Sequence, residues 1–346
     1  MTRPATRVLV TAVGGDLGQA LVKAFRIGEA DFEIIGCDLD SSGVGGAFVS
    51  AFEAVPAAAD SAGYVSAIDD LCKRQAIDAV IPASEAEILV LARLGPSLPG
   101  GTSIICQPVD WLQTFGDKLR CMQALKPHLP LVGFADSSDG KSVQQLVDEV
   151  GFPLVVKMRR SSGSQGIRVV HNTEELERCV ADRPASVVQQ FMDDCEGEFS
   201  VGVFASRHFT EVLAFRRELR GWGCSCFAET SQDSVVTGYA LEFARASHLQ
   251  GSANIQLRKS AGRVYLLEVN ARFSSLVAAR ALCGFRDAEW SVQTALGRPP
   301  SRPPSAYGKI KFRRFFHELI DTGSGYFAIT QWMPREQRYC LEEEPR

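Results

Sequence analysis

Short apolar runs alternate with helix-type spacing of apolar residues over the first third of the chain. The strand-like runs lie at residues 8–13, 33–38, 79–82 and 103–107. Apolar residues on one helical face lie at 17–25, 64–72, 88–94 and 109–125. Strands that alternate with helices are typical of a parallel sheet covered by helices. We therefore expect a Rossmann-like α/β lobe over residues 1–110, bounded near Trp111.

The pattern changes after Gly151, where strand-like runs follow one another more directly. These runs lie at 153–157, 167–170, 186–192 and 199–205, with one helix expected at 174–180. Such an order is typical of an α+β arrangement. We expect residues 111–297 to form this region, with a small lobe over about 125–192 and an antiparallel sheet lobe over about 193–297. Four prolines within 298–305 indicate a linker to a peripheral C-terminal extension, 298–346.

Composition narrows the classes of partner. The formal net charge is −4 and no long basic run occurs, so we expect no nucleic-acid partner. No run approaches the roughly 18 apolar residues of a membrane span, and the N-terminal apolar run is too short for a signal peptide. The ten cysteines form no CxxC framework, which is typical of reduced thiols. We therefore expect a cytoplasmic protein without a membrane partner.

A lysine at a strand end precedes a loop of small residues. The strand Leu154-Val-Val-Lys157 leads to the loop Ser161-Ser162-Gly163-Ser164-Gln165-Gly166. Such a loop lets backbone N–H groups approach phosphate oxygens closely, which indicates a phosphate cover between two strands. A flexible hairpin with a surface lysine would have the same pattern, and the loop alone does not separate the two.

Two further segments present oxygen ligands. They are Asn254-Ile-Gln256 and Val264-Tyr-Leu-Leu-Glu268-Val-Asn270-Ala-Arg272. Glu268 and Asn270 are two residues apart in a strand, so their side chains share one face. A carboxylate and an amide oxygen are hard ligands of the kind that Mg²⁺ prefers. A polar sheet edge is the alternative reading, but the apolar run before Glu268 indicates a core strand, where an unpartnered carboxylate would be costly.

The order of these segments resembles the ATP-grasp superfamily. It is most similar to the stand-alone carboxylate–amine ligases of the carbamoyl-phosphate-synthase-like group, such as the ligase family of pyrrolysine biosynthesis. The resemblance covers about residues 6–297 and includes an N-terminal pre-ATP-grasp lobe. Its specific part is the ordered set Lys118, Lys157, the Gly loop, Glu198, Gln256 and Glu268-x-Asn270-x-Arg272.

The resemblance implies a nucleotide site. In such a site Lys118 and Lys157 hold ATP phosphates, and a loop closes over them at Ser162, Gly163, Ser164 and Gly166. Adenine meets a hinge strand at Gln189, Gln190, Phe191 and Met192. Glu198 then holds the ribose hydroxyls.

The resemblance also implies a metal and catalytic face. Gln256, Glu268 and Asn270 would bind Mg²⁺, with Mn²⁺ as an alternative ion. Arg272 is the leading catalytic residue, because it would stabilise charge on the transferred phosphoryl group, and Lys157 would assist it. Two departures, Gln190 for the commoner Glu and Ala271 for the commoner Pro, remove no ligand.

The implied reaction joins a small-molecule carboxylate to an amine through an acyl phosphate, with ATP converted to ADP. We expect the carboxylate to be an amino acid, whose second charge could pair with Arg216, Arg217 or Arg220. No Ser-His-Asp or Cys-His arrangement suggests a protein nucleophile, which agrees with this reaction. The sequence leaves the oligomeric state open, with a homodimer as one option.

Three alternatives remain at this point. An ATP-grasp kinase would use the same clamp to phosphorylate a hydroxyl, and a degenerate module would bind nucleotide without turnover. A nicotinamide-dependent oxidoreductase would use the turn Gly14-Gly15-Asp16-Leu17-Gly18, with Asp38 placed to bind a ribose. Such turns also occur in pre-ATP-grasp lobes, and no Tyr-x-x-x-Lys pair follows, so we favour the ligase.

Overall fold

The computed structural model describes residues 5–28, 30–41, 43–160, 166–183, 185–192, 196–220, 224–314, 319–321 and 326–328. Residues 1–312 form one compact unit. The second unit, residues 313–346, contains the antiparallel strands β16 (Leu319–Asp321) and β17 (Tyr326–Ala328). Among the described residues, no helix combines the length and the apolar character needed to cross a bilayer.

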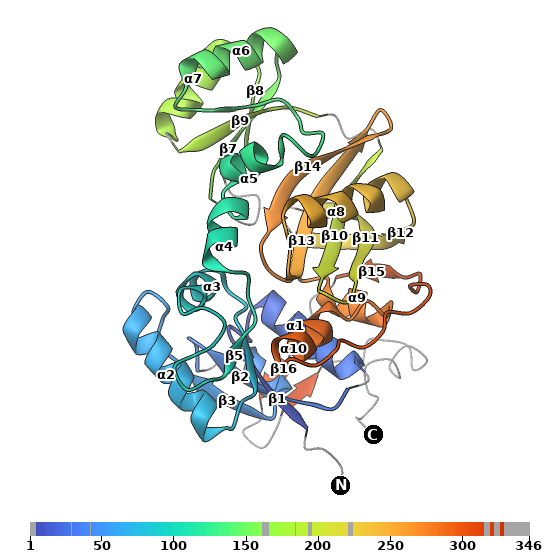
Figure 1. Ribbon diagram of the computed structural model, residues 1–346. Helices are drawn as coiled ribbons and strands as arrows, with labels where there is room; N and C mark the ends of the chain where they lie inside the picture. Colours follow the sequence, from blue (N-terminus) through green and yellow to red (C-terminus); the bar gives the residue numbers. More distant parts are fainter. Residues whose placement is uncertain are drawn as a thin grey trace. The chain divides into compact units, whose positions relative to one another are not determined.

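The N-terminal lobe is a parallel sheet with helices on both faces (Figure 1). Its strand order is β3-β2-β1-β4-β5. The strands are β1 (Thr6–Val10), β2 (Phe32–Asp38), β3 (Ala51–Ala54), β4 (Ala79–Ile81) and β5 (Ser103–Ile104). The helices are α1 (Asp16–Ile27), the 3-10 helix η1 (Val44–Phe48), α2 (Ser61–Arg74) and α3 (Glu85–Ala92). Because successive strand side chains point to opposite faces, Val8 packs with α1 whereas Leu9 packs with α2 and α3.

Two short helices lead from this lobe to the next. The sequence predicted a single helix over 109–125, and this was wrong, because α4 (Val109–Phe115) ends at Gly116 and α5 (Lys118–Leu125) starts anew. The Asp117 side chain caps α5 by accepting hydrogen bonds from the backbone N–H groups of Leu119 and Arg120. The break therefore places Lys118 in the first turn of α5.

The small lobe is a four-stranded antiparallel sheet with the order β6-β9-β7-β8. Its strands are β6 (Phe134–Asp136), β7 (Leu154–Met158), β8 (Arg168–Val170) and β9 (Ser186–Gln190). Helices α6 (Gly140–Val150) and α7 (Thr173–Asp182) cover one face through Leu146 and Leu176. The other face borders a cavity described below.

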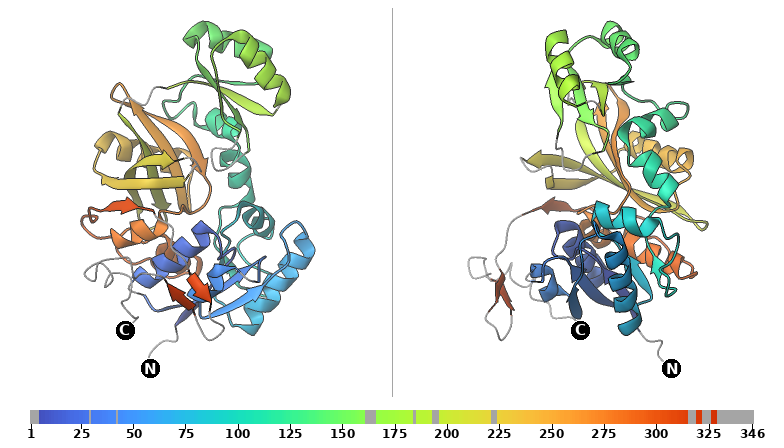
Figure 2. Two further views of the ribbon diagram at one scale, coloured as in Figure 1. Left: turned by 180° about the vertical axis from the view of Figure 1, so that it is seen from behind. Right: turned by 90° about the vertical axis from the view of Figure 1, so that its left-hand side faces the viewer.

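The central lobe is a six-stranded sheet with the order β14-β13-β10-β11-β12-β15. Its strands are β10 (Gly197–Ala205), β11 (Thr210–Arg220), β12 (Cys224–Ser231), β13 (Gly251–Ser260), β14 (Arg263–Asn270) and β15 (Lys311–Arg313). Helix α8 (Ser234–Ala246) packs on one face, whereas α9 (Val277–Leu282) and α10 (Asp287–Ala295) pack on the other. Figure 2 shows the small lobe in green and the central sheet in yellow to orange from two further sides.

The predicted fold class, a Rossmann-like α/β lobe followed by α+β lobes, is confirmed. Helices α9 and α10 also contact α1 through Val277 and Val292, so the N-terminal and central lobes share this helical layer. Residues 298–312, predicted to start a linker, belong to the larger unit. There the Tyr307 hydroxyl donates to Glu211 Oε2 at 2.6 Å.

Candidate active site

One face of the central sheet gathers the polar residues that the sequence motif separates along the chain. Residues opposite each other in antiparallel strands project to the same face. The pairs on this face are Glu198 with Arg217, Glu198 with Arg258, Gln256 with Glu268, and Asn254 with Asn270. The register therefore brings together the predicted ribose and metal residues.

Glu198 is held by two arginines. Arg217 donates from Nε and Nη2 to Oε1 at 3.0 and 2.6 Å, and Arg258 Nη2 donates to Oε2 at 2.7 Å. Burial raises the pKa of Glu198, but the two guanidinium groups outweigh burial and hold that pKa below its ordinary value. A carboxylate has about four acceptor positions, of which three are taken here. The predicted ribose contact of Glu198 therefore has about one position left.

A cavity of about 220 Å³ lies between the small and central sheets. Its apolar walls include Val155, Val169 and Leu267, and its polar groups include Lys157 and Glu268. Burial lowers the pKa of Lys157 to about 8, and Lys118 and Arg258 act in the same direction against Glu268 and Glu198. A cavity that combines apolar walls with cationic side chains suits an adenine ring and its phosphates.

The predicted hinge lines this cavity. The lining includes Gln189, Gln190, Phe191 and Met192. The Gln189 side chain is buried and contacts Met122 Sδ, and its backbone lies in β9 between β6 and β7. The Met192 carbonyl accepts from Arg258 Nη1 at 2.9 Å, which ties the hinge to the Glu198 cluster.

The predicted phosphate loop is only partly visible. Ser162, Gly163 and Ser164 lie outside the described residues. Gly166, the first described residue after them, has φ +76°, a backbone conformation that favours glycine. A Cβ at this position would lie 3.2 Å from Met158 Cγ.

Lys118 lines a second cavity, whereas Lys157 lines the first, and Glu268 lines both. The Lys118 Nζ is 3.6 Å from Glu268 Oε2, and its backbone N–H donates to Arg159 O at 3.0 Å. Asp117 forms a salt bridge with Arg159 at 2.9 Å and lies 3.7 Å from Arg160. Helix α5 is thereby fastened to the end of β7, which carries Lys157.

Arg272 lies at the second cavity, of about 110 Å³, between the central sheet and α3. Its Nη2 is 3.5 Å from Glu85 Oε1, and its Nη1 donates to Phe273 O at 3.1 Å. Lys118, Arg160 and Asn270 line the same cavity. Glu268 lines both this cavity and the cavity of about 220 Å³, so it stands where the two meet.

The residues present fit a magnesium ion bound together with phosphates. Glu268 and Asn270 offer a carboxylate and an amide oxygen on one face, and Mg²⁺ commonly takes one or two carboxylates plus substrate phosphates. Within the described chain no group of three or more His, Cys, Asp or Glu side chains forms a complete protein cage. Gln256 Oε1 already accepts from Arg217 Nη2 at 2.7 Å, which makes Gln256 a weaker ligand than predicted.

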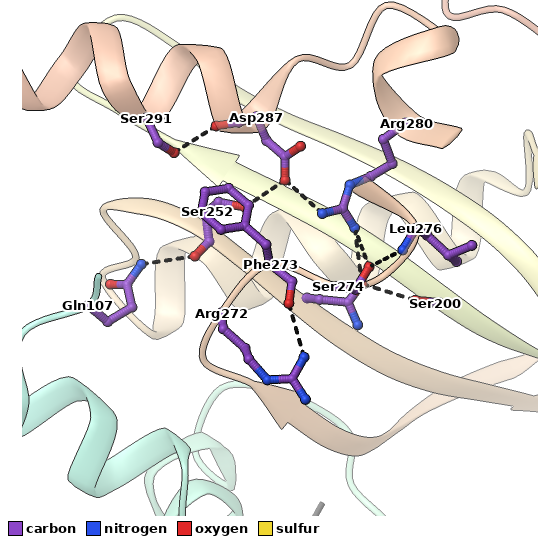
Figure 3. A network of polar contacts seen from close by, with 11 residues as sticks. Gln107, Ser200, Ser252, Arg272, Phe273, Ser274, Leu276, Arg280, Asp287 and Ser291 are labelled. Atoms are coloured by element: carbon purple, nitrogen blue, oxygen red, sulfur yellow. Dashed lines mark hydrogen bonds and ion pairs between the residues drawn. The ribbon is translucent and has the colours of Figure 1, made fainter. Parts of the chain in front are cut away.

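A buried polar network supports the loop that follows Arg272 (Figure 3). Arg280 Nη2 donates to Asp287 Oδ2 at 2.7 Å, and Nη1 donates to Ser274 Oγ at 3.0 Å and Asn254 Oδ1 at 3.2 Å. Arg280 is 1% exposed and Asp287 is fully buried. Ser252 Oγ also donates to Asp287 Oδ2 at 2.7 Å. The network joins α9, α10 and β13 to the residue two positions after Arg272.

Several site residues were not identified from the sequence. Arg258 could have been found, because it follows Gln256 by two residues and so shares its strand face. Glu85, Arg160 and Gln107 come from other lobes and had no local signal. Arg217, considered as a partner for the substrate's second charge, is instead bonded to Glu198, while the Arg220 side chain lies outside the described part.

The geometry also addresses the oxidoreductase alternative. Asp38 Oδ2 accepts from the backbone N–H of Gly14 at 2.8 Å, so this acid holds the turn rather than standing open to a ribose. Gly45 of η1 packs against the same turn so closely that a Cβ there would lie 2.5 Å from the carbonyl carbon of Val13. The glycine-rich turn is thus closed by the protein's own backbone.

Comparison with known proteins finds relatives in sequence. Residues 182–315 match the profile of a family described as ATP-grasp in the biosynthetic pathway with Ter operon. The carbamoyl phosphate synthase large chain of Pasteurella multocida is 26% identical over an alignment of 197 residues, and the match covers 51% of this chain. The matched region is 18% of that relative, so the chain spans a small part of its length.

Solved structures share the fold over most of the chain. The biotin carboxylase domain of Hydrogenobacter thermophilus 2-oxoglutarate carboxylase has a TM-score of 0.71 at 14% identity, covering 96% of this chain and 84% of that one. An L-amino acid ligase from Bacillus licheniformis has a TM-score of 0.65 at 18% identity, covering 85% of this chain and 75% of that one. The ordered motif, the three lobes and these similarities place the chain in the ATP-grasp superfamily.

Proposed function

We propose that this protein is an ADP-forming ligase that uses ATP and Mg²⁺ to activate the carboxylate of an amino acid and then couples it to an amine. We place the nucleotide in the cavity of about 220 Å³ that includes Lys157, which is called the nucleotide cavity from here on. The observation that carries the proposal is the position of Glu268, which lines both this cavity and the cavity at Arg272. A phosphoryl group passing from one cavity to the other would cross beside Glu268. The same arrangement holds Lys118, 3.6 Å from Glu268, on the transfer path.

The reaction has two steps. A carboxylate oxygen of the substrate attacks the γ-phosphorus, the new O–P bond forms, and the bond to the β-phosphate oxygen breaks to release ADP. A neutral amine then attacks the acyl carbon, the C–O bond to phosphate breaks, and the amine gives up one proton. Phosphoryl transfer needs mainly positioning and charge neutralisation, which Lys118, Lys157 and Arg272 supply.

A bound Mg²⁺ would neutralise charge on the phosphates and orient them. Glu268 and Asn270 are the residues that would hold it. Arg272 acts on the other side of the transferred group, where negative charge develops on the acyl phosphate. Its contacts with Glu85 and Phe273 O keep the guanidinium at the edge of the second cavity.

The choice of an amino acid rests on the mixed charges of the second cavity. Arg272, Arg160 and Lys118 can pair with a carboxylate, whereas Glu85 can pair with an ammonium group. Glu85 has a side chain that is 53% exposed and lies 3.5 Å from Arg272, so an amino acid could bind both residues at once. The similar L-amino acid ligase from Bacillus licheniformis is consistent with this class of substrate.

The test is a panel of amino acids and other small carboxylates with ATP and Mg²⁺. We expect ADP release with one class of amino acid and, when hydroxylamine replaces the amine, a hydroxamate of that amino acid. A hydroxamate can form because hydroxylamine displaces phosphate from an acyl phosphate. Stable phosphorylation of a hydroxyl compound without any hydroxamate would favour the kinase alternative, and NADH binding would favour the oxidoreductase.

A further inference from the structure

A third cavity, of about 190 Å³, lies beyond Arg272. Ile88, Ala271 and Arg272 line both this cavity and the one at Glu85, so the two are neighbours around the catalytic arginine. Ile88 lies three residues after Glu85 on α3 and therefore on the same helical face. The three cavities thus follow one another, with Glu268 between the first two and Arg272 between the last two.

The walls of this cavity differ in chemistry from those of its neighbour. Most of its lining is apolar, including Ile104, Ile105 and Phe273. Its polar lining is neutral and includes Gln107, Ser252, Ser291 and Thr294, and among the described lining residues Arg272 alone carries a charge. Several of these residues are drawn in Figure 3. A cationic group placed here would lose hydration and would meet Arg272, which carries a charge of the same sign.

Gln107 adds a neutral acceptor to the wall. Its Nε2 donates to Gln250 O at 2.7 Å and to Ser252 O at 3.1 Å, which fixes the orientation of the amide. The side chain is 3% exposed, and Oε1 is buried with no hydrogen-bond partner within the described part of the chain. Because Oε1 is buried and Nε2 is already bonded to the backbone, Gln107 presents a fixed and neutral amide at the wall.

We propose that this third cavity binds the side chain of the substrate and selects amino acids with uncharged, mainly apolar side chains. The inference rests on the proposed ligase function. The substrate carboxylate lies at Arg272, its ammonium group at Glu85, and its side chain extends past Ile88 and Ala271 into the third cavity. The exposed residues Thr294 and Ala295 at the rim leave the cavity open to solvent.

The cavity size sets an upper limit on that side chain. A buried apolar cavity of about 150 Å³ is large enough to bind benzene. The observed 190 Å³ therefore accommodates groups up to about the size of a phenylalanine side chain. Glycine and alanine would leave much of it unfilled. Lysine would bring a second positive charge next to Arg272, and the side-chain carboxylate of aspartate would find only Arg272, which already pairs with the substrate's α-carboxylate.

The experiment compares amino acids in wild type and in a variant with a filled cavity. Ser291 is buried on α10 and its hydroxyl donates to Asp287 O at 2.7 Å, so Ser291→Leu adds volume from a rigid element. Ser291→Ala removes the hydroxyl without adding volume and separates the two effects. Ala62→Leu, on an exposed position of α2, makes a matched addition outside the site.

We expect wild type to release ADP with leucine or phenylalanine at higher kcat/KM than with glycine, aspartate or lysine. Ser291→Leu should lower kcat/KM for phenylalanine by about 10- to 200-fold, the range for a mismatch in an apolar pocket, and leave glycine within about twofold. Thr294→Glu, at the exposed rim, should raise kcat/KM for lysine relative to kcat/KM for leucine. Ala62→Leu should have the same kcat/KM as wild type for every amino acid tested.

The outcomes separate the two proposals. One contradicting outcome is that wild type forms hydroxamates but prefers aspartate or lysine. Another is that folded Ser291→Leu lowers kcat/KM for phenylalanine and for glycine by the same factor. In either case the cavity assignment is wrong while the ligase function stands. If no amino acid yields ADP, the proposed function fails. Calorimetric titration of phenylalanine in the presence of ADP and Mg²⁺ then tests the cavity directly. If phenylalanine does not bind, the proposal that the cavity binds a side chain is wrong as well.

Discussion

Lys118 Nζ lies 3.6 Å from Glu268 Oε2, so a predicted phosphate ligand and a predicted metal ligand face each other at the junction of two cavities. Both side chains are largely shielded, with 8% and 18% of their surface exposed. Charges that attract each other in this position hold the two ligands in place before the nucleotide binds. The pair makes the metal and the phosphates interdependent.

Glu268→Gln is expected to fold normally and to lose nearly all ADP release, because the carboxylate contributed to the metal is removed. ADP production should be measured across a Mg²⁺ titration. Glu177→Gln, an exposed position on α7, is the matched control and should behave as wild type. Near wild-type turnover of Glu268→Gln at ordinary Mg²⁺ concentrations would show that the metal lies elsewhere.

Lys157 should make nucleotide binding sensitive to pH. Burial lowers the pKa of Lys157 to about 8, and phosphates favour its charged form. Affinity for ATP should therefore fall as pH rises through about 8, and binding near that pH should take up a proton. Calorimetry in two buffers of different ionisation enthalpy measures the uptake, which Lys157→Met should abolish and exposed Lys141→Met should retain.

The same shift affects the nucleotide-free protein in the opposite sense. Lysine in an unfolded chain has a pKa of about 10.4, so between about pH 8 and pH 10 the unfolded state binds more protons than the folded state. The contribution of Lys157 to stability should thus become more favourable as pH rises over that range. The urea midpoints of wild type and Lys157→Met should be compared between about pH 8 and pH 10. If their difference does not change with pH, the lowered pKa of Lys157 is contradicted.

The Glu198 cluster should be important for stability as well as for nucleotide binding. Glu198→Gln leaves Arg217 and Arg258 without their carboxylate, and removing one partner of a buried pair costs about 3–5 kcal/mol. Urea denaturation should show a loss on this scale, somewhat reduced by the partial exposure of Arg258. Glu242→Gln, which disrupts the exposed pair with Arg245, should cost less than about 1 kcal/mol. Equal effects of the two changes would argue against a buried cluster.

Arg272→Ala should slow ADP release by roughly 10²- to 10³-fold, the scale for losing a positioned charge-stabilising donor. ATP affinity should change little, because Arg272 lines the second and third cavities but not the nucleotide cavity. Single-turnover kinetics together with an ATP-binding titration separate the two effects. A variant that loses ATP affinity but keeps its turnover rate would move Arg272 out of the catalytic role.

Arg280→Met should destabilise the protein by about 3–5 kcal/mol, because it leaves Asp287 charged and fully buried. The double change Arg280→Met with Asp287→Leu should recover part of the loss, since it removes both charges. Urea unfolding of the two single variants and the double variant gives the coupling free energy. Simple additivity would mean that the two residues do not interact.

The sequence predicted those parts of the site whose members are close together along one strand. Glu268, Asn270 and Arg272 are separated by single residues, so alternation in a strand is enough to place two of them on one face. The lobes were predicted from the spacing of their apolar residues, which differs between strands and helices. The predicted helix over 109–125 failed because Gly116 and Asp117, a stop and a cap, interrupt a continuous apolar spacing.

Contacts between distant segments could not be predicted in this way. Arg217 reaches Glu198 only because β10 and β11 pair in one particular register. Glu85 contacts Arg272 from another lobe. In the sequence it is an acidic residue in the first turn of a helix, which is common and gives no sign of this contact. The roles assigned to individual residues from the family resemblance remain predictions for the experiments above.

Gly202 has a consequence for how this sequence can vary. A Cβ at that position in β10 would lie 2.5 Å from Arg280 Cδ, so the arginine occupies the volume that any other residue at 202 would need. Glycine at 202 and arginine at 280 are therefore admissible as a pair, although 78 positions separate them in the chain. A larger residue at 202 therefore requires a change at 280, whereas Arg280 can be replaced while Gly202 is kept. An engineered library that randomises position 202 alone is expected to favour glycine.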